Sequence, residues 1–186
     1  MGTLILFNLV SIDGYFAAPG GELDWHNVDE EFQLFAIEQL DSAAALLFGR
    51  VTYQLMAAFW PSPEALKADP QTAARMNSLP KYVVSRTLKS ADWNNTQLLK
   101  RVDPDEIRAL RDAKDKHLFL LGSAELAASL AALDLIDEYR VMVNPIALGG
   151  GLPLFRELRE PRRFDLIAAR TFRNGNVLLY YRPVRA

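Results

Sequence analysis

Small residues, hydroxyls and arginines recur directly after the predicted strands of this chain. The first strand is followed by Ser11–Gly14 (SIDG), the second by Gly49–Thr52 (GRVT), the third by Ser85–Arg86 and a fourth by Gly122–Ser123. Glycine lets the backbone approach a ligand closely, and arginine binds phosphate oxygens through a planar fork of donors. Helix N-termini next to such turns offer free N–H groups, so the set suits a ligand rich in phosphate.

Each of these motifs also has a purely structural explanation. Gly49–Arg50 fits a strand-to-helix turn with a solvated arginine, Ser123 fits a helix cap, and Gly149–Gly151 fits a tight turn. The sequence has neither G-x-G-x-x-G after a strand nor the phosphate loop G-x-x-x-x-G-K-[ST]. The prediction of a binding site therefore depends on the motifs lying together in space.

The elements that would position these motifs alternate along the chain. Short apolar runs bounded by turn residues predict strands. Helices are expected where an aspartate able to cap them precedes a helical pattern, in two cases with proline next. The strands are predicted at Thr3–Val10, Ala45–Phe48, Lys81–Ser85, His117–Leu121 and Glu138–Pro145, and the helices from Asp29 to Leu40, from Asp69, and from Asp103 to Ala113.

A hairpin is predicted near the end of the chain. Asn174–Gly175, a strong signal for a tight turn, separates the strands Phe164–Phe172 and Val177–Tyr181. Strands that alternate with helices imply a mostly parallel sheet covered on both faces, and the hairpin adds antiparallel strands at one edge. The sequence thus predicts an α/β fold, a three-layer α-β-α domain with a mixed central sheet, as a single domain over residues 1–186.

Composition argues against several classes of partner and site. The formal net charge is −2, with both signs scattered, which disfavours a nucleic-acid groove or an anionic membrane surface as partner. There is no cysteine, and His26 and His117 are far apart in the sequence, so we expect no metal centre. The apolar stretch Met1–Val10 lacks the basic leader and cleavage site of a signal peptide, so we expect a cytoplasmic protein.

The order of the motifs resembles the dihydrofolate reductase superfamily. The likeness is carried by Ser11–Gly14, Leu47–Tyr53 (LFGRVTY), Val83–Arg86 (VVSR), Leu121–Ser123 (LGS) and the tail Asn144–Phe155. It covers nearly the whole chain and is greatest for stand-alone proteins related to the reductase domain of the riboflavin-biosynthesis deaminase-reductase. The resemblance implies a dihydrofolate-reductase-like fold and an NADPH-dependent reductase of a small heterocyclic or carbonyl substrate.

The resemblance also implies where the cofactor would bind. Gly49, Arg50 and Thr52 would hold its phosphates, as the matching residues do in the superfamily. Ser85–Arg86 would flank the adenosine 2′-phosphate and so favour NADPH over NADH. Gly122–Ser123, at the start of a helix, would hold the pyrophosphate.

The substrate side of such a site is expected around the loop Tyr15–Trp25, which resembles the mobile loop that closes over the nicotinamide. Trp25 and Gly149–Gly150 would line it. Riboflavin-pathway reductases usually have lysine where this chain has Tyr15, and glutamate where it has Leu121. Those polar groups serve the phosphoribosylamino-pyrimidine in that family, so the identity of the substrate stays open here.

Two carboxyl groups are candidates for the proton donor that reduction of a C=N or C=O bond needs. A partly buried carboxyl with a raised pKa would suit that role. Asp13 ends the first strand, and Glu31 stands about where dihydrofolate reductases keep their pterin-binding acid. Glu31 also has a structural alternative, because Asp29–Glu31 form an acidic first turn that complements the helix dipole.

Two other functions and a quaternary state complete the expectations. A true dihydrofolate reductase is disfavoured because His26–Asp29 (HNVD) stands where the usual Trp-x-x-Pro segment would be. A non-catalytic nucleotide-binding protein on the same fold stays open. We expect a homodimer, since the closing hairpin presents Val177, Leu179 and Tyr181 on one face and an edge that needs a cover.

Overall fold

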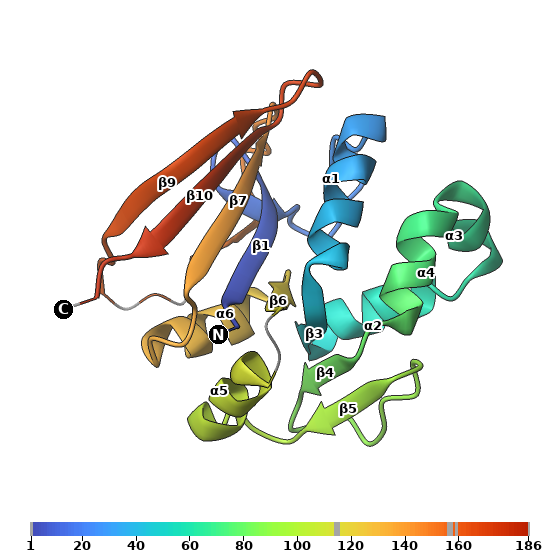
Figure 1. Ribbon diagram of the computed structural model, residues 1–186. Coiled ribbons are helices and arrows are strands. Elements are labelled where there is room, and N and C mark those ends of the chain that lie inside the picture. The colour runs from blue at the N-terminus through green and yellow to red at the C-terminus, as the bar shows by residue number, and fades with distance from the viewer. Residues whose placement is uncertain (1, 114–115, 156–157, 159, 186) are drawn as a thin grey trace.

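An eight-stranded sheet in the order β5-β4-β3-β6-β1-β7-β10-β9 forms the centre of the computed structural model, which describes residues 2–113, 116–155, 158 and 160–185 (Figure 1). The strands from β5 to β7 run parallel, and β10 and β9 follow antiparallel. The predicted mixed, mostly parallel sheet with a closing hairpin is confirmed. Its strands are β1 (Leu4–Ser11), β3 (Ala43–Gly49), β4 (Lys81–Val84), β5 (Thr96–Leu99), β6 (His117–Leu121), β7 (Glu138–Asn144), β9 (Phe164–Thr171) and β10 (Val177–Pro183).

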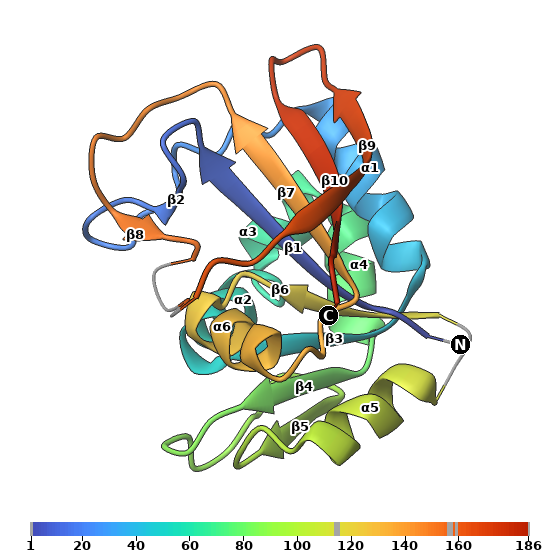
Figure 2. The same cartoon turned by 90° about the vertical axis from the view of Figure 1, so that its left-hand side faces the viewer.

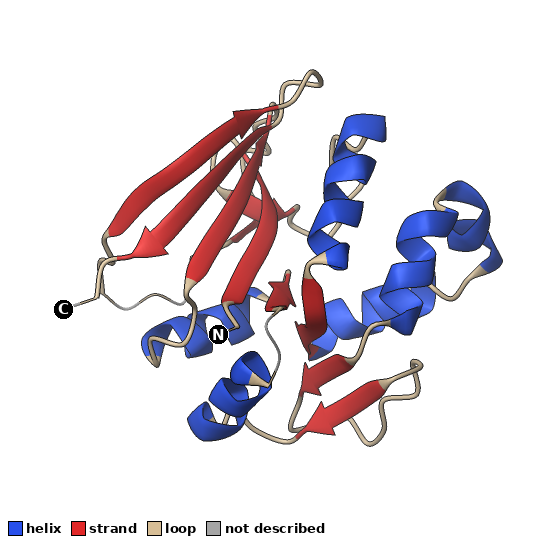
Figure 3. Ribbon diagram, in the orientation of Figure 1, coloured by secondary structure: helices blue, strands red, loops and turns tan. Residues whose placement is uncertain are grey.

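Helices cover both faces of the sheet, as Figure 3 shows. On one face α1, α2 and α4 pack against side chains such as Leu46 and Phe48, and α3 packs on α4. On the other face α5 and α6 pack against Leu47 and Leu120. Successive side chains of a strand point to opposite faces, so β3 contributes to both layers. The helices are α1 (Glu30–Asp41), α2 (Arg50–Phe59), α3 (Pro63–Ala68), α4 (Pro70–Ser78), α5 (Pro104–Asp112) and α6 (Ala124–Ala132).

Side-chain caps begin four of the six helices in the described part of the chain. The carboxylate of Asp29 accepts a hydrogen bond of 2.9 Å from an N–H in the first turn of α1, and Asp69 does the same for α4 at 3.0 Å. Asp103 and Ser62 cap α5 and α3. Each cap satisfies an N–H that helix geometry leaves without a partner. The three aspartate caps predicted from the sequence are confirmed.

The structure differs from the expected strands in three places. The edge strand β5, with four residues, was not predicted. The loop after β1 and the glycine-rich tail contribute an antiparallel pair, β2 (Tyr15–Ala17) and β8 (Leu152–Pro153), which projects beyond the end of β1 (Figure 2). Both strands are too short to show a periodic pattern. Within the hairpin, β10 lies between β7 and β9. Val177, Leu179 and Tyr181 therefore belong to an inner strand, and the free edge is β9.

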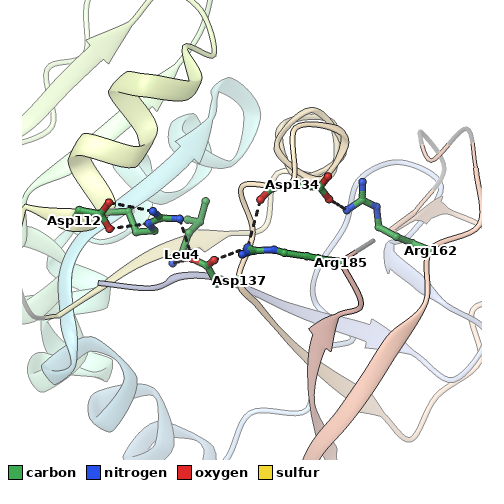
Figure 4. A network of polar contacts seen from close by, with 7 residues as sticks. Leu4, Asp112, Asp134, Asp137, Arg162 and Arg185 are labelled. Atoms are coloured by element: carbon green, nitrogen blue, oxygen red, sulfur yellow. Dashed lines mark hydrogen bonds and ion pairs between the residues drawn. The ribbon is translucent and has the colours of Figure 1, made fainter. Parts of the chain in front are cut away.

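A network of ion pairs holds the amino ends of β1 and β7 together (Figure 4). Asp137, directly before β7, accepts hydrogen bonds from the backbone N–H of Leu4 at 2.9 Å and from Arg185 at 2.7 Å. Arg111 of α5 lies 3.5 Å from the same carboxylate. The network fastens α5 and the C-terminal segment to the edge of the sheet opposite the predicted binding motifs. The neighbouring pairs are Arg111–Asp112 and Arg162–Asp134.

Candidate active site

The motifs that follow β4, β3, β6 and β1 meet at the carboxyl edge of the sheet. These four strands are neighbours in that order and run parallel, so their last residues lie side by side. Figure 2 shows the arrowheads of β4, β6 and β1 directed to the same side. Ligands of open α/β sheets bind at this edge. The motifs therefore lie together at one edge of the sheet, as expected from the sequence.

Direct hydrogen bonds join the turn after β3 to the turn after β6. The backbone N–H of Gly49 donates to Ser123 Oγ at 2.8 Å, and the N–H of Ser123 donates to Thr52 Oγ1 at 3.1 Å. The Ser123 hydroxyl in turn donates to the carbonyl of Leu121 at 3.0 Å. Thr52 and Ser123 thus fix the ends of two neighbouring strands relative to each other.

The turn from β6 to α6 has left-handed backbone at two consecutive residues. The φ angles are +59° at Gly122 and +63° at Ser123. A Cβ added to Gly122 would lie 2.9 Å from Thr52 Oγ1 and 3.0 Å from its Cγ2. Glycine is required here both by the backbone conformation and by the close approach of α2. Strained residues of this kind persist where the surroundings hold them, often beside a ligand.

The helices that follow these two turns begin without a side-chain cap. Gly49, which has no side chain to accept a hydrogen bond, precedes α2. Ser123 precedes α6, and its hydroxyl accepts none from the first helical turn. The other four helices of the described chain each have an aspartate or serine cap. Free N–H groups and the positive end of the helix dipole attract phosphate oxygens. Two such termini side by side are a candidate site for a diphosphate.

Two exposed arginines stand beside these termini. Arg50 is the first residue of α2 and donates a hydrogen bond of 3.1 Å to the Gln54 amide oxygen. Arg86 follows β4, the neighbour of β3. Within the described residues neither is paired with a carboxylate, so both guanidinium groups are available to an anion. Ser85 is buried, and its hydroxyl accepts from the N–H of Leu88 at 3.0 Å, so it holds the turn that presents Arg86.

Asp13 fastens the end of β1 to the loop after β7. Its carboxylate accepts from Ser11 Oγ at 2.6 Å and from the N–H groups of Leu148 at 3.1 Å and Gly149 at 2.8 Å. These hydrogen bonds, above all the one from Ser11, favour the charged form and lower the pKa of Asp13 to about 2. The prediction of a raised carboxyl pKa is wrong for Asp13, which is exposed and receives too many donors.

Glu31 also has a lowered pKa. Its carboxylate accepts from the backbone N–H of Arg173 at 3.0 Å and lies 3.7 Å from the guanidinium of Arg170. The N–H of Arg173 is the main cause of the lowered pKa, and the two positive charges add to it. The raised pKa expected for Glu31 is wrong as well. This carboxylate connects the first turn of α1 to the β9–β10 hairpin.

The loop between β2 and α1 meets the glycine-rich loop after β7. Gly150 lies against Pro19, whose ring would be 3.9 Å from a Cβ at that glycine. Trp25 is half-buried, and its indole N–H donates to the carbonyl of Glu22 at 3.1 Å. Its ring packs edge-to-face on His26, with centroids 4.5 Å apart. The loop that carries Trp25 therefore borders the predicted substrate side of the site. The contacts of Trp25 with Glu22 and His26 both lie within this loop.

A cluster of buried asparagines, which the sequence analysis missed, anchors the same end of the sheet. The backbone N–H of Asn27 donates to the Asn144 side chain at 2.9 Å, and the Asn27 amide donates to the carbonyl of Asn174 at 2.7 Å. The side chain of Asn176 donates to the carbonyl of Asn27 at 2.8 Å. Asn144 and Asn176 are fully buried, so they need such partners. The only signal in the sequence was Asn174-x-Asn176, which also fits a plain hairpin turn.

Metal ligands and membrane spans are not found in the ranges that the structure describes. No group of three or more His, Cys, Asp or Glu residues there is placed to hold a metal ion. None of the helices in those ranges is long and apolar enough to cross a membrane. His117, one of the two histidines, packs edge-to-face on Phe119 with centroids 6.0 Å apart.

The strand order, the three layers and the carboxyl-edge turns define a dihydrofolate-reductase-like α/β domain. Comparison with known families narrows this class. The model of the RibD C-terminal domain family matches residues 2–178, so the chain belongs to that family. The resemblance to this family stated from the sequence is confirmed, and structures of the same fold include a deaminase/reductase from Thermotoga maritima, with a TM-score of 0.69 and 15% identity over 98% of this chain and 57% of that one.

Individual proteins show the same relationship. The chain is similar to the uncharacterized protein YyaP of Bacillus subtilis, with 29% identity over 178 residues, 96% of this chain and 93% of that protein. A structure from Shewanella sp. PV-4, whose name connects it with riboflavin biosynthesis, has a TM-score of 0.74 and 28% identity, with both chains covered completely. Dihydrofolate reductase from Enterococcus faecalis, complexed with NADP(H), has a TM-score of 0.67 and 15% identity over 99% of this chain and 98% of that one.

Proposed function

We propose that residues 1–186 form one reductase domain that transfers a hydride from NADPH to a small heterocyclic or carbonyl substrate. The observation that carries the proposal is the pair of uncapped N-termini of α2 and α6, joined through Thr52 and Ser123 and flanked by unpaired arginines. Membership of the RibD C-terminal domain family supports it.

The residues at the carboxyl edge fit this cofactor. The free N–H groups of α2 and α6 would bind the pyrophosphate oxygens, since both helices direct their positive ends to the same place. Gly49 and Gly122 let the two turns lie close together, since a Cβ at these positions would lie against Ser123 and Thr52. Arg50 would add a charge-assisted hydrogen bond, and Arg86, held by the Ser85 turn, would bind the 2′-phosphate that distinguishes NADPH from NADH.

Bound NADPH would supply the hydride, and the substrate would need a proton at the adjacent nitrogen or oxygen atom. The low pKa values leave Asp13 and Glu31 ionised at neutral pH, so neither is placed to donate that proton. We assign Asp13 as a positioning residue that holds Gly149 and its loop at the end of β1. Water at this exposed edge is the proposed proton donor.

The substrate is proposed only as a class. Tyr15 and Leu121 stand where a lysine and a glutamate serve the phosphoribosylamino-pyrimidine of riboflavin-pathway reductases. Dihydrofolate reduction and nucleotide binding without catalysis are the two alternatives. A homodimer and a cytoplasmic location remain predictions.

Turnover assays separate these functions. NADPH consumption is followed with pterins, pyrimidines and small carbonyl compounds, for the wild type, for Arg50→Ala and for Arg108→Ala, an exposed arginine of α5 paired with Asp105, as matched control. The proposal predicts turnover with at least one substrate. It also predicts that Arg50→Ala raises the KM for NADPH and that Arg108→Ala leaves this KM unchanged. Turnover of dihydrofolate alone would favour the first alternative. NADPH binding without any turnover would favour the second.

A further inference from the structure

Asn8 is a buried amide on β1 with an acceptor that the described chain does not use. It is 3% exposed, and its Nδ2 donates a long hydrogen bond of 3.4 Å to the carbonyl of Gly122. Asn8 Oδ1 accepts from no donor among the described residues. Unlike the unpartnered Nε2 of His26, this oxygen keeps contact with solvent. Buried amide oxygens normally have a donor, so a ligand that brings one would complete the hydrogen bonding of this side chain.

Asn8 lies where β1 and β6 separate. Their parallel pairing ends at Phe7 and Leu121, and beyond this pair β1 continues beside β7 alone (Figure 2). Phe7 and Leu9 pack on the face of the sheet that carries α1. Because side chains alternate along a strand, Asn8 points to the other face, which carries α6. Its amide therefore lies between the end of β1 and the turn at Gly122 that leads into α6.

The proposed cofactor site determines which part of NADPH would reach this amide. Arg86, after β4, would bind the 2′-phosphate of the adenosine. The N-termini of α2 and α6, after β3 and β6, would bind the pyrophosphate. These strands follow one another in the order β4-β3-β6-β1, and neighbouring strands lie about 4.8 Å apart. A cofactor that lies along the carboxyl edge in this order brings its nicotinamide to the end of β1.

Ser11 and Asp13, the polar side chains that follow Asn8 along the chain, already use their oxygens. The Ser11 hydroxyl donates to Asp13 at 2.6 Å and accepts from the N–H of Tyr15 at 3.0 Å. The Asp13 carboxylate accepts from Ser11 and from two backbone N–H groups of the loop after β7. Asn8 Oδ1, by contrast, is free to accept an N–H from a ligand.

We propose, on the basis of the reductase function proposed above, that Asn8 Oδ1 accepts a hydrogen bond from the carboxamide N–H of the nicotinamide. The carbonyl of Gly122 would keep Nδ2 and so fix which end of the Asn8 amide faces the cofactor. The hydrogen bond would hold the nicotinamide ring at one rotation about its bond to ribose, and hence orient the C4 hydrogen that is transferred. Asn8 is thus a cofactor-positioning residue that the sequence motifs did not indicate.

Calorimetric titration of the full chain with a set of related ligands tests this contact. NADPH has the carboxamide, its reduced 3-acetylpyridine analogue has a methyl group in place of the carboxamide NH2, and 2′-phospho-ADP-ribose lacks the ring altogether. The wild type should bind NADPH roughly threefold to tenfold more tightly than the analogue, as one hydrogen bond would give. Asn8→Leu, of similar shape, should bind NADPH and the analogue alike and keep its affinity for 2′-phospho-ADP-ribose. Asn94→Leu, before β5, is the matched control, because the Asn94 amide also donates at 3.4 Å to a carbonyl; it should change none of these affinities.

Several outcomes would overturn the inference. A wild type that binds NADPH no better than the analogue, or an Asn8→Leu variant that keeps this preference, would do so. An equal loss of affinity for NADPH and 2′-phospho-ADP-ribose in Asn8→Leu would do so too, because the amide would then only hold the turn at Gly122. Circular dichroism checks the fold, and Asn8→Ala gives the same comparison if leucine is not accommodated. A wild type that binds neither NADPH nor 2′-phospho-ADP-ribose would reject the reductase proposal as well, whereas binding of both without a carboxamide preference would reject only the role of Asn8.

Discussion

Gly122→Ala tests the geometry of the proposed pyrophosphate site. Gly122 has a φ of +59° at the turn from β6 to α6, and its missing Cβ makes room for Thr52. An alanine would place a carbon 2.9 Å from Thr52 Oγ1, closer than such atoms approach without displacement. The threonine side chain must then rotate away and lose its 3.1 Å hydrogen bond from the N–H of Ser123.

The expected loss of stability is the sum of two effects. Left-handed backbone at alanine costs about 1 kcal/mol. Breaking the hydrogen bond and leaving the Ser123 N–H without a partner costs about 1–3 kcal/mol more. Gly122→Ala should therefore lower the free energy of unfolding by about 2–4 kcal/mol. Gly14→Ala is the matched control, because Gly14 has a φ of +86° and no atom within 4 Å of a Cβ, so it should cost only about 1 kcal/mol.

Urea denaturation of the single and double variants measures both effects. Thr52→Ala alone removes the same hydrogen bond and should cost about 1–3 kcal/mol. In that background the methyl group of Gly122→Ala meets no hydroxyl, so its cost should fall to about 1 kcal/mol. An equal cost of Gly122→Ala in both backgrounds would refute the reasoning. NADPH affinity should fall in Gly122→Ala, because the turn carries the N-terminus of α6.

Three further perturbations follow from single residues. Asp137→Asn weakens the network at the amino edge and should lower the free energy of unfolding by about 1–3 kcal/mol in denaturant titrations, with NADPH affinity unchanged. Burial lowers the pKa of Lys81 from 10.5 to about 8, so the native state binds fewer protons than the unfolded state between these values and stability rises with pH there. The melting temperature of the wild type should therefore rise with pH between about 8 and 10.5, and that of Lys81→Met should not. The pKa of Asp13 is about 2 against 3.8, so its stabilising effect is lost as pH falls from about 4 toward 2. Asp13→Asn should lack this acid-dependent loss in acid denaturation.

The parts of the fold that the sequence predicted are those determined by local patterns. Buried parallel strands such as β1 and β6 appear as apolar runs, because both faces are covered. The caps Asp29, Asp69 and Asp103 satisfy N–H groups only two or three residues away. The meeting of the turns after β3 and β6 followed from the parallel sheet, since strand ends share one edge.

The protonation of the two carboxyls was not predictable in this way. The pKa of Asp13 is lowered most by the hydroxyl of nearby Ser11. The N–H groups of Leu148 and Gly149 lower it further, and the main donor to Glu31 is Arg173. All three lie more than 130 residues along the chain from the acid they affect. Burial and hydrogen bonding of a carboxyl depend on such contacts, so sequence position alone favoured the wrong direction of the pKa shift.

The remaining features that escaped prediction also depend on distant residues. The strands β2 and β8 exist only because they pair with each other, from opposite ends of the chain. The asparagine cluster joins Asn27 of the loop before α1 to Asn144 at the end of β7 and to Asn174 of the β9–β10 turn. The bulge in β9 at Ile167 is set by the register with β10.

Titration of the purified protein with NADPH and with NADH, followed by fluorescence, tests the central claim most directly. The account predicts micromolar binding of NADPH and binding of NADH weaker by roughly tenfold or more, as expected for a charge-assisted contact to the 2′-phosphate. Arg86→Ala should bring the two affinities together, and Arg50→Ala should weaken both. Failure to bind either nucleotide, or a preference for NADPH unchanged by Arg86→Ala, would contradict the account.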